Sequence, residues 1–226
     1  MALDSDGEVW LGPVQDVAFD YPLIDSVTQF NGHVWSIRTD TVDIDGQVVE
    51  RDVMIHPGAV GIIVLDEQDR IYLLRQYRHP VAMALFEGPA GLMDVAGEDA
   101  LSTAKRELAE EAGLVANHWN VLVDYLSSPG GTTEALRSYL ARDISPIAGG
   151  RVETGEAEEV HLPGAWVPLD EAYQLVMAGK ISNVLSVVGI LAAYSSRAAG
   201  WSNLRAADVP WPVRDHLLAT GRVHGE

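Results

Sequence analysis

The chain has 226 residues, of which 47% are hydrophobic, and its 33 acidic side chains outnumber its 15 basic ones to give a net charge of −18. This length suits one domain, or one domain with a small addition, and the apolar fraction is enough for a core. The charge would repel the phosphate backbone of DNA or RNA, so we expect no nucleic-acid partner. Because the chain has no cysteine, disulfides, thiol chemistry and zinc–thiolate sites are excluded.

The first residues, M-A-L-D-S-D-G-E, are acidic and lack the apolar stretch of a signal peptide. The most apolar helix candidate, residues 184–193, is shorter than the ~20 residues that a membrane span needs. We therefore interpret this stretch as a buried core helix. We expect a cytoplasmic protein that has no membrane partner.

The N-terminal region is expected to be irregular over residues 1–29 and to continue as a β-hairpin. Residues 34–44 alternate between apolar and polar side chains, Asp45-Gly46 is a hairpin turn signal, and residues 47–55 suit the return strand. A lone hairpin is only marginally stable. It must therefore pack on the main domain or on a second subunit.

The rest of the chain mixes strands and helices. Residues 59–65 form a continuous apolar run, which is typical of a strand buried on both faces. Asp170 and Ser182 are candidate N-caps for two later helices. This mixture predicts an α/β fold with a mixed β-sheet between helical layers. Further strands are expected at residues 70–77, 120–126, 136–142 and 166–169, and helices at residues 170–178 and from residue 184.

The most informative stretch is R-E-L-A-E-E-A-G, residues 106–113. On an α-helix Glu107, Glu110 and Glu111 share one face, so their carboxylates repel one another. A hard divalent cation such as Mg²⁺ or Mn²⁺, which prefers carboxylate oxygens, would relieve this repulsion. An acidic helix face is more often plain solvated surface. Here a glycine loop precedes the helix and Gly113 suits its C-terminal cap, which favours a metal site.

This stretch and its flanks resemble the Nudix box, G-x5-E-x7-R-E-U-x-E-E-x-G-U, in which U is an aliphatic residue. The family glycine position holds Leu92, and Gly91 stands one residue earlier. The resemblance implies a Nudix α/β/α sandwich that uses Mg²⁺, with Mn²⁺ as an alternative. It implies Glu107, Glu110 and Glu111 as metal ligands and adds the backbone carbonyl of Ala90. The residues in register with the family pattern are Glu98, Arg106, Glu107, Leu108, Glu110, Glu111, Gly113 and Leu114.

Three further segments resemble the ADP-ribose pyrophosphatase subfamily, namely residues 74–80, residues 86–91 and residues 127–134. This resemblance implies hydrolysis of the pyrophosphate bond of ADP-ribose to AMP and ribose 5-phosphate. It also implies a homodimer that forms through the N-terminal sheet. The expected organisation is an N-terminal β subdomain, a Nudix hydrolase domain and a C-terminal tail of unassigned role, at residues 1–55, 56–198 and 199–226. We expect the tail to pack on the core or on the partner subunit.

Candidate substrate contacts lie on both sides of the box. The guanidinium of Arg78 suits the substrate phosphates, and Arg51 is a weaker candidate of the same kind. Glu87 could accept from a sugar hydroxyl or assist the metal. The plain alternative for Arg78 is a solvent-exposed position at a strand edge.

The loop after the box adds a second group of candidates. The small residues Gly130, Gly131 and Thr132 could let the backbone approach a ribose closely, although the same residues suit an ordinary turn. The adenine would need an aromatic platform. Candidates near the N-terminus are Trp35, Tyr21 and Phe30.

Catalytic roles are expected for Arg106, Glu111 and one loop glutamate. Arg106 could pair with Glu110 at i,i+4 and orient it, or form an ordinary surface ion pair. The subfamily places its general base in a loop that corresponds to residues 155–160, where Glu158 and Glu159 are the candidates. A charged loop of this kind is solvent-exposed without a catalytic role about as often as it supplies a general base.

Two other functions stay open. A Nudix hydrolase could act on another nucleoside diphosphate sugar or on a dinucleotide, because distant loops rather than the box select the substrate. The chain could also be a non-catalytic sensor that binds ADP-ribose. A sensor would be expected to lose box glutamates, whereas this chain keeps all of them.

Overall fold

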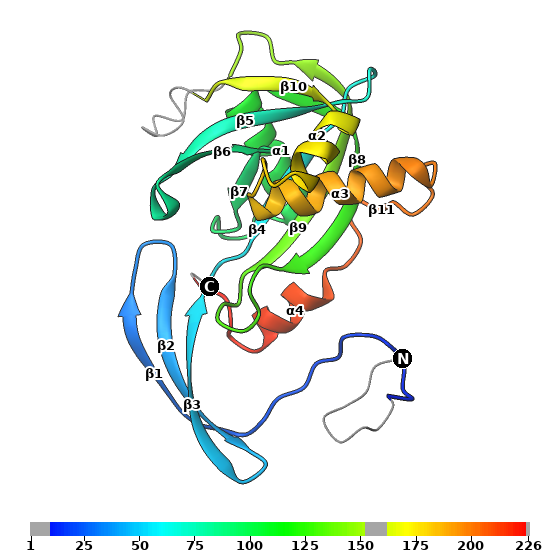
Figure 1. Cartoon of the computed structure of the whole chain (residues 1–226). Helices are drawn as coiled ribbons and strands as arrows, with labels where there is room; N and C mark the ends of the chain where they lie inside the picture. Colours follow the sequence, from blue (N-terminus) through cyan, green and yellow to red (C-terminus); the bar gives the residue numbers. More distant parts are fainter. Residues whose placement is uncertain (1–9, 152–161, 225–226) are drawn as a thin grey trace.

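The computed structural model describes residues 10–151 and 162–224. Over these residues the N-terminal part builds a separate three-stranded sheet, and the remainder builds a larger α/β body (Figure 1). The candidate general bases Glu158 and Glu159 lie outside the described residues. Within the described ranges, no helix combines the length and the apolar character that a membrane span requires.

The N-terminal sheet is an antiparallel meander of β1 (Leu23–Asn31), β2 (Ser36–Ile44) and β3 (Gln47–Ile55). The predicted hairpin is confirmed, since Asp45 and Gly46 have φ angles of 51° and 86° and form a turn with both central residues left-handed. The prediction of irregular structure up to residue 29 is wrong for β1. This strand is exposed along its whole length and its pairing with β2 shifts register twice, so its apolar side chains follow no simple alternation.

The main sheet has five strands in the order β11-β8-β9-β4-β7. β4 pairs in parallel with β9, whereas the other neighbouring strands pair antiparallel, which confirms the predicted mixed sheet. β4 is buried at every position, as its apolar run predicts. The strands are β4 (Ala59–Val64), β7 (Ala90–Leu92), β8 (Leu114–Leu126), β9 (Ala135–Pro146) and β11 (Arg205–Ala206).

A second sheet of three antiparallel strands runs in the order β10-β5-β6. A short 3₁₀ turn, η1 (His79–Val81), joins β5 to β6. The end of β6 leads directly into β7 and the box, so this sheet positions the entry to the box. Its strands are β5 (Arg70–Arg78), β6 (Met83–Glu87) and β10 (Gly164–Pro168).

The described residues contain four α-helices: α1 (Ala100–Ala112), α2 (Leu169–Met177), α3 (Val184–Ala198) and α4 (Pro212–Ala219). The N-caps predicted at Asp170 and Ser182 are wrong. α2 begins at Leu169, whose amide donates to the carbonyl of Asp69. The cap of α3 is Asn183, whose side chain accepts from an amide in the first turn.

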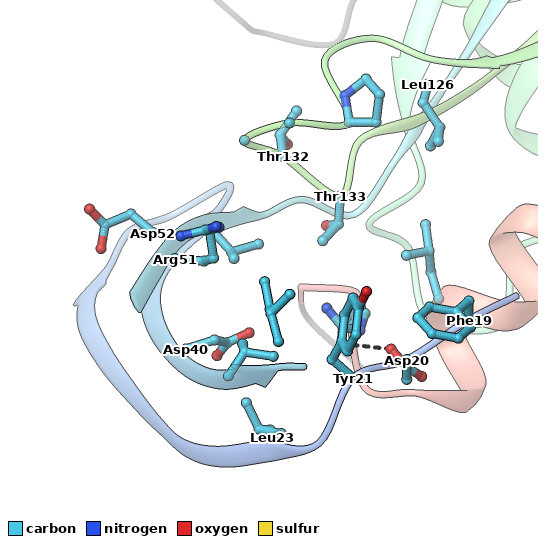
Figure 2. Close-up of a pocket in the computed structure, with 18 residues that line it drawn as sticks. Phe19, Asp20, Tyr21, Leu23, Asp40, Arg51, Asp52, Leu126, Thr132 and Thr133 are labelled. Atoms are coloured by element: carbon cyan, nitrogen blue, oxygen red, sulfur yellow. Dashed lines mark hydrogen bonds and ion pairs between the residues drawn. The ribbon is translucent and has the colours of Figure 1, made fainter. Parts of the chain in front are cut away.

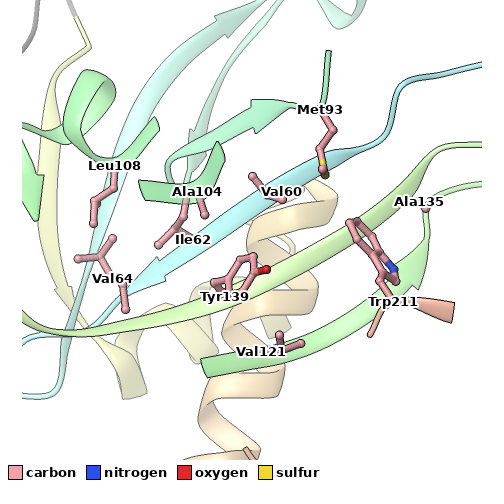
Figure 3. Close-up of a cluster of buried hydrophobic side chains, with 11 residues drawn as sticks. Val60, Ile62, Val64, Met93, Ala104, Leu108, Val121, Ala135, Tyr139 and Trp211 are labelled. Atoms are coloured by element: carbon pink, nitrogen blue, oxygen red, sulfur yellow. The ribbon is translucent and has the colours of Figure 1, made fainter. Parts of the chain in front are cut away.

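β4 divides the core into two clusters, because successive side chains of a strand point to opposite faces of the sheet. Val60 and Ile62 belong to the cluster that contains Leu108 of α1 (Figure 3), whereas Ile63 packs with Ile190 of α3. One face of the sheet is therefore covered by α1 and the other by α2 and α3. This arrangement confirms the predicted α/β/α sandwich.

The C-terminal tail packs on the core, as the sequence predicts. β11 extends the main sheet beside β8. Trp211, which is only 5% exposed, belongs to the cluster on the α1 side (Figure 3). The tail is therefore part of the folded body.

Candidate active site

The box helix α1 turns two of its acidic side chains into the protein. Its buried positions include Ala104, Glu107, Leu108 and Glu111, which follow the spacing of one helical face. Glu107 and Glu111 are only 8% and 4% exposed. Buried carboxylates require compensating charge or hydrogen bonds. This face of the helix is therefore not a plain solvated surface.

Arg106 supplies much of this compensation. Its Nη1 donates to Glu107 Oε1 at 2.6 Å and to Glu110 Oε2 at 3.1 Å, and its Nε and Nη2 donate to the two oxygens of Glu98 at 3.1 and 3.0 Å. The hydrogen bond to Glu98 is the largest cause of a raised pKa of Arg106. The same bond lowers the pKa of Glu98. The contact predicted between Arg106 and Glu110 is present, and Arg106 holds Glu107 as well.

The segment that follows β6 lies across the two buried glutamates. The amide of Ala90 donates to Glu111 Oε2 at 2.8 Å. A Cβ added at Gly91 would overlap the carboxylate of Glu107, so only glycine allows this close approach. The glycine that is displaced by one residue from the family pattern therefore brings the loop into direct contact with the helix.

The carboxylate oxygens of the box glutamates suit a hard divalent cation. In this conformation, however, these carboxylates form hydrogen bonds and ion pairs with other protein groups. In residues 10–151 and 162–224, no group of three or more His, Cys, Asp or Glu is arranged to hold a metal ion. Glu107 and Glu110 accept from Arg106, and Glu111 accepts from the amide of Ala90. Buried carboxylate oxygens one helical turn apart, beside a loop backbone, are nevertheless the ligands that Mg²⁺ and Mn²⁺ prefer. The residues present therefore fit a divalent metal.

Two predicted substrate ligands, Arg78 and Glu87, bind each other. Arg78 Nη2 lies 2.7 Å from Glu87 Oε2 and its Nε lies 3.0 Å from Glu87 Oε1, which makes a forked ion pair. The side chain of Glu87 is 2% exposed, whereas that of Arg78 is 39% exposed. Glu87 ends β6, just before the segment that contacts α1. The pair therefore holds a partly exposed guanidinium at the entry to the box.

A cavity of about 480 Å³ lies between the N-terminal sheet, the loop before β9 and the C-terminal tail (Figure 2). The predicted substrate residues Arg51 and 130–132 line it, whereas the box glutamates and the Arg78–Glu87 pair do not. The structure therefore divides the predicted site residues into two groups. One group surrounds the box, and the other surrounds this cavity.

The loop of residues 127–134 is fastened to the end of β3. The Met54 amide donates to the Gly131 carbonyl at 2.9 Å, and the Thr133 amide donates to the Met54 carbonyl at 3.0 Å. The His56 amide donates to Thr133 Oγ1, also at 3.0 Å. A Cβ added at Gly130 or Gly131 would meet nothing within 4 Å. Protein packing does not require these two glycines, and both face space that a ligand can approach.

One of the aromatic candidates lines the cavity. Tyr21 is in its wall beside Phe19, with the two ring centres 5.0 Å apart in an edge-to-face contact. Phe30 and Trp35 contact each other instead, at 5.9 Å. The tail also contributes residues to the cavity wall. No sequence pattern predicts them, because they reach the cavity only when the tail folds back onto the body. Cavity residues that sequence reasoning missed include Asp40, Leu217 and Arg222.

A family model described as the NUDIX domain matches residues 55–185. The chain belongs to the Nudix family. It is 39% identical over 204 residues to an ADP-ribose pyrophosphatase of Mycobacterium tuberculosis (strain ATCC 25618 / H37Rv), a match that covers 90% of this chain and 97% of that protein. It is 31% identical over 173 residues to a methanol dehydrogenase activator of Bacillus methanolicus, which covers 76% and 91% of the two chains. A crystal structure of an ADP compounds hydrolase shares the fold, with a TM-score of 0.66 at 19% identity over 92% of this chain and 100% of that one.

The Nudix match begins at the last residue of β3 and ends at the start of α3. The N-terminal sheet and the tail lie outside the matched residues, yet both contribute walls to the cavity. The Nudix match contains the box, the Arg78–Glu87 pair and the cavity loop with residues 130–132. The cavity is built largely from elements that surround the Nudix domain.

Proposed function

We propose that this Nudix protein hydrolyses the pyrophosphate bond of ADP-ribose and releases AMP and ribose 5-phosphate, with Mg²⁺ as the metal. The observation that carries the proposal is the intact box, in which Glu107 and Glu111 are buried against the Ala90-Gly91 segment. The Mycobacterium tuberculosis relative, named ADP-ribose pyrophosphatase, supports the choice of substrate.

In the proposed mechanism Glu107 and Glu111 would hold the metal, with Glu110 and the carbonyl of Ala90 as further ligands. Arg106 orients Glu107 and Glu110 through its Nη1. When bound, a divalent cation neutralises phosphate charge and lowers the pKa of a coordinated water. The general base is proposed in the loop of residues 155–160, at Glu158 or Glu159.

The two groups of residues suit the two kinds of chemistry in the substrate. The guanidinium of Arg78, held in place by Glu87, would bind the pyrophosphate next to the box. Arg51 and residues 130–132 would bind a sugar or base portion within the cavity, where Tyr21 offers an aromatic surface. A substrate with a charged pyrophosphate and a bulky sugar or base portion fits this division.

We further propose that residues 1–55 form a dimerisation subdomain, residues 56–198 the hydrolase domain and residues 199–226 the tail. All nine residues of β1 are exposed, and Leu23, Ile24, Val27 and Phe30 are between 48% and 55% exposed. An exposed apolar edge strand is a pairing surface that soluble proteins normally cover. A second copy of this chain is the proposed cover.

The experiment measures AMP release from ADP-ribose with and without Mg²⁺, beside ADP-glucose, NADH and diadenosine polyphosphates. Glu111→Gln should abolish turnover, because it removes a buried carboxylate charge from the box. Glu171→Gln, which removes an exposed carboxylate on α2, is the matched control and should leave turnover unchanged.

Each outcome of the panel separates the candidate functions. Cleavage of ADP-ribose that needs the metal and Glu111 would support the proposal. Preferential cleavage of another compound would support the reaction at the box but show that ADP-ribose is not the preferred substrate. The panel includes other compounds because one relative, the methanol dehydrogenase activator, carries a different name. Binding of ADP-ribose without cleavage of any compound would favour the sensor.

A further inference from the structure

The C-terminal tail connects three places that lie far apart in the sequence (Figure 1). Its strand β11 pairs with β8, and Trp211 enters the core on the α1 side. Its last described turn brings Arg222 to Asp20, with Nη2 and Oδ1 3.2 Å apart in the cavity wall. The tail lies outside the Nudix match, and the box chemistry gives it no role.

A buried arginine fixes the tail where Trp211 enters the core. Arg137 on β9 is 3% exposed, and its Nε donates to Asp124 at 2.7 Å. Its Nη1 and Nη2 donate to the carbonyls of Val209 and Pro210 at 2.9 and 3.0 Å. Its guanidinium also lies over the Trp211 ring, 4.8 Å from the ring centre. The tail is therefore held in one register where it enters α4.

From this anchor, Arg214 of α4 reaches the linker between β3 and β4. Arg214 is 7% exposed, and its Nη1 donates to the carbonyl of Pro57. The next residue, Gly58, has a φ of 83°, and a Cβ there would lie 2.9 Å from Arg214 Nη1 and 3.0 Å from the carbonyl of Ala135. The Gly58 carbonyl accepts from the Met93 amide at 3.0 Å. The linker is therefore held by α4 on one side and by the segment after β7 on the other.

This linker joins the two groups of proposed site residues. On one side, β3 carries Arg51 into the cavity, and Met54 fastens the cavity loop. On the other side, β4 pairs with β7 at Gly61 and Ala90, and the amide of Ala90 binds Glu111. A substrate that contacts both groups requires a fixed relation between them. A misplacement of about 1 Å can lower a rate by about 10²-fold.

We propose that Arg214 is a positioning residue for the reaction. By holding the Pro57-Gly58 linker, it fixes the cavity relative to the box so that both can contact one substrate molecule. The proposal rests on the proposed function, because it needs a substrate that spans both groups. A guanidinium suits this role, since it stays charged and its planar fork has several donors in fixed directions. Gly58 is the matching residue on the linker, because any side chain there would displace Arg214.

The test compares Arg214→Met with Arg205→Gln. Arg214→Met keeps an unbranched apolar stem and loses the guanidinium donors, whereas Arg205→Gln removes a 2.8 Å tail ion pair with Asp124 that does not involve the linker. With ADP-ribose and Mg²⁺, we expect kcat/KM to fall about tenfold or more in Arg214→Met. It should stay within about twofold of the wild type in Arg205→Gln.

Two readouts distinguish positioning from a general loss of stability. The Met93 amide, which donates to Gly58, should exchange its hydrogen about tenfold faster in Arg214→Met and not in Arg205→Gln, because only the first variant loosens the linker. Mn²⁺ binding, followed by electron paramagnetic resonance, should be the same in both variants and the wild type. The box residues are unchanged in all three proteins.

Gly58→Ala acts on the same link from the other side and should reproduce the loss in kcat/KM. The double variant of Gly58→Ala and Arg214→Met should lose little more than either single variant, as expected for two residues that act as one unit. If Arg214→Met does not fold, Arg214→Lys, which retains the charge and a donor, and Gly58→Ala provide the same comparison.

Unchanged kcat/KM together with unchanged Met93 exchange in a folded Arg214→Met protein would overturn the proposal. An equal loss of kcat/KM in Arg205→Gln would overturn it as well, because any damage to the tail would then suffice. A wild-type protein that does not cleave ADP-ribose would instead overturn the proposed function. In that case the Met93 exchange rate alone decides whether Arg214 locks the linker.

Discussion

Arg106 binds both oxygens of Glu98 through Nε and Nη2 while its Nη1 bridges Glu107 and Glu110. One side chain therefore fixes a structural carboxylate and two proposed metal ligands at the same time. Lysine cannot reproduce this fork, because its ammonium is a single point charge. Loss of a residue that orients metal ligands typically lowers metal affinity or activity by about 10- to 100-fold.

We therefore expect Arg106→Lys to lower kcat or to raise the Mg²⁺ concentration for half-maximal rate by about 10- to 100-fold. The measurement is the Mg²⁺ dependence of ADP-ribose hydrolysis. Arg70→Lys is the matched control, since Arg70 binds Asp66 at 2.7 Å in the turn between β4 and β5, away from the box. Equal effects of the two variants would show that Arg106 is an ordinary ion-pair residue.

The close approach of Glu107 to Gly91 predicts that a larger residue at position 91 will impair the protein. A Cβ at Gly91 would overlap the Glu107 carboxylate, so Gly91→Ala must displace the Glu107 side chain from Arg106, or else the loop or the helix. We expect Gly91→Ala to lower kcat about a hundredfold and to lower the melting temperature. Adding Glu107→Ala should restore the melting temperature, because it removes the overlapping group, and should leave the protein inactive. Failure of this second change to restore stability would place the strain elsewhere.

Asp99 links the stability of the box helix to pH. Its side chain caps α1 by accepting from the amides of Leu101 and Ser102 at 3.0 Å each. Hydrogen bonds from Ser102 are the largest cause of a pKa of Asp99 below its usual 3.8. Because the folded-state pKa is the lower one, the stabilisation is complete above the unfolded-state pKa and is lost as the pH falls through the folded-state pKa.

We expect Asp99→Ala to lower the free energy of unfolding by about 1 kcal/mol at neutral pH. The difference between the wild type and the variant should shrink as the pH falls below 3.8. Urea unfolding at neutral and acidic pH measures both values. A difference that stays constant across this range would show that the ionised form of Asp99 has no advantage as a cap.

Local patterns were enough to predict the elements in which one physical signal dominates. The apolar run of β4 indicated burial on both faces, Asp45-Gly46 indicated the hairpin, and Gly113 indicated the end of α1. In each case the signal depends on neighbouring residues alone. The spacing of Glu107 and Glu111 likewise placed both on one helical face, although the sequence did not show that this face is buried.

Features that depend on distant contacts were not predictable. β1 was missed because an exposed strand with two register shifts carries no apolar period. Arg78 and Glu87 pair although they are not cross-strand partners, since Arg78 lies opposite Met83 and Glu87 opposite Leu74. The contribution of Arg222 to the cavity depends on the path of the whole tail. These contacts are properties of the assembled fold and leave no local pattern.

Arg51 tests whether the cavity binds substrate. It lines the cavity, and its Nη1 donates to the carbonyl of Glu50 at 2.9 Å. We expect Arg51→Gln to raise KM for ADP-ribose about tenfold with little change in kcat, because it removes a charged contact that is made equally in the ground state and the transition state. Steady-state kinetics measure both constants. Arg70→Gln removes the same charge outside the cavity and should leave KM unchanged. Equal KM values for the wild type and Arg51→Gln would exclude Arg51 from the site.

Val27 tests whether β1 is the dimer surface. It is 48% exposed and lies in the middle of a strand whose residues are all exposed. A carboxylate placed within an apolar interface is left unpaired when the interface closes, which costs several kcal/mol. We therefore expect Val27→Glu to shift the protein from dimer to monomer in sedimentation equilibrium at micromolar concentration, while its far-ultraviolet circular dichroism stays that of the wild type. Met177→Glu, at a position on α2 that is 62% exposed, is the matched control and should sediment as the wild type does. A wild-type monomer, or a Val27→Glu protein that dimerises normally, would contradict the proposed role of the N-terminal sheet.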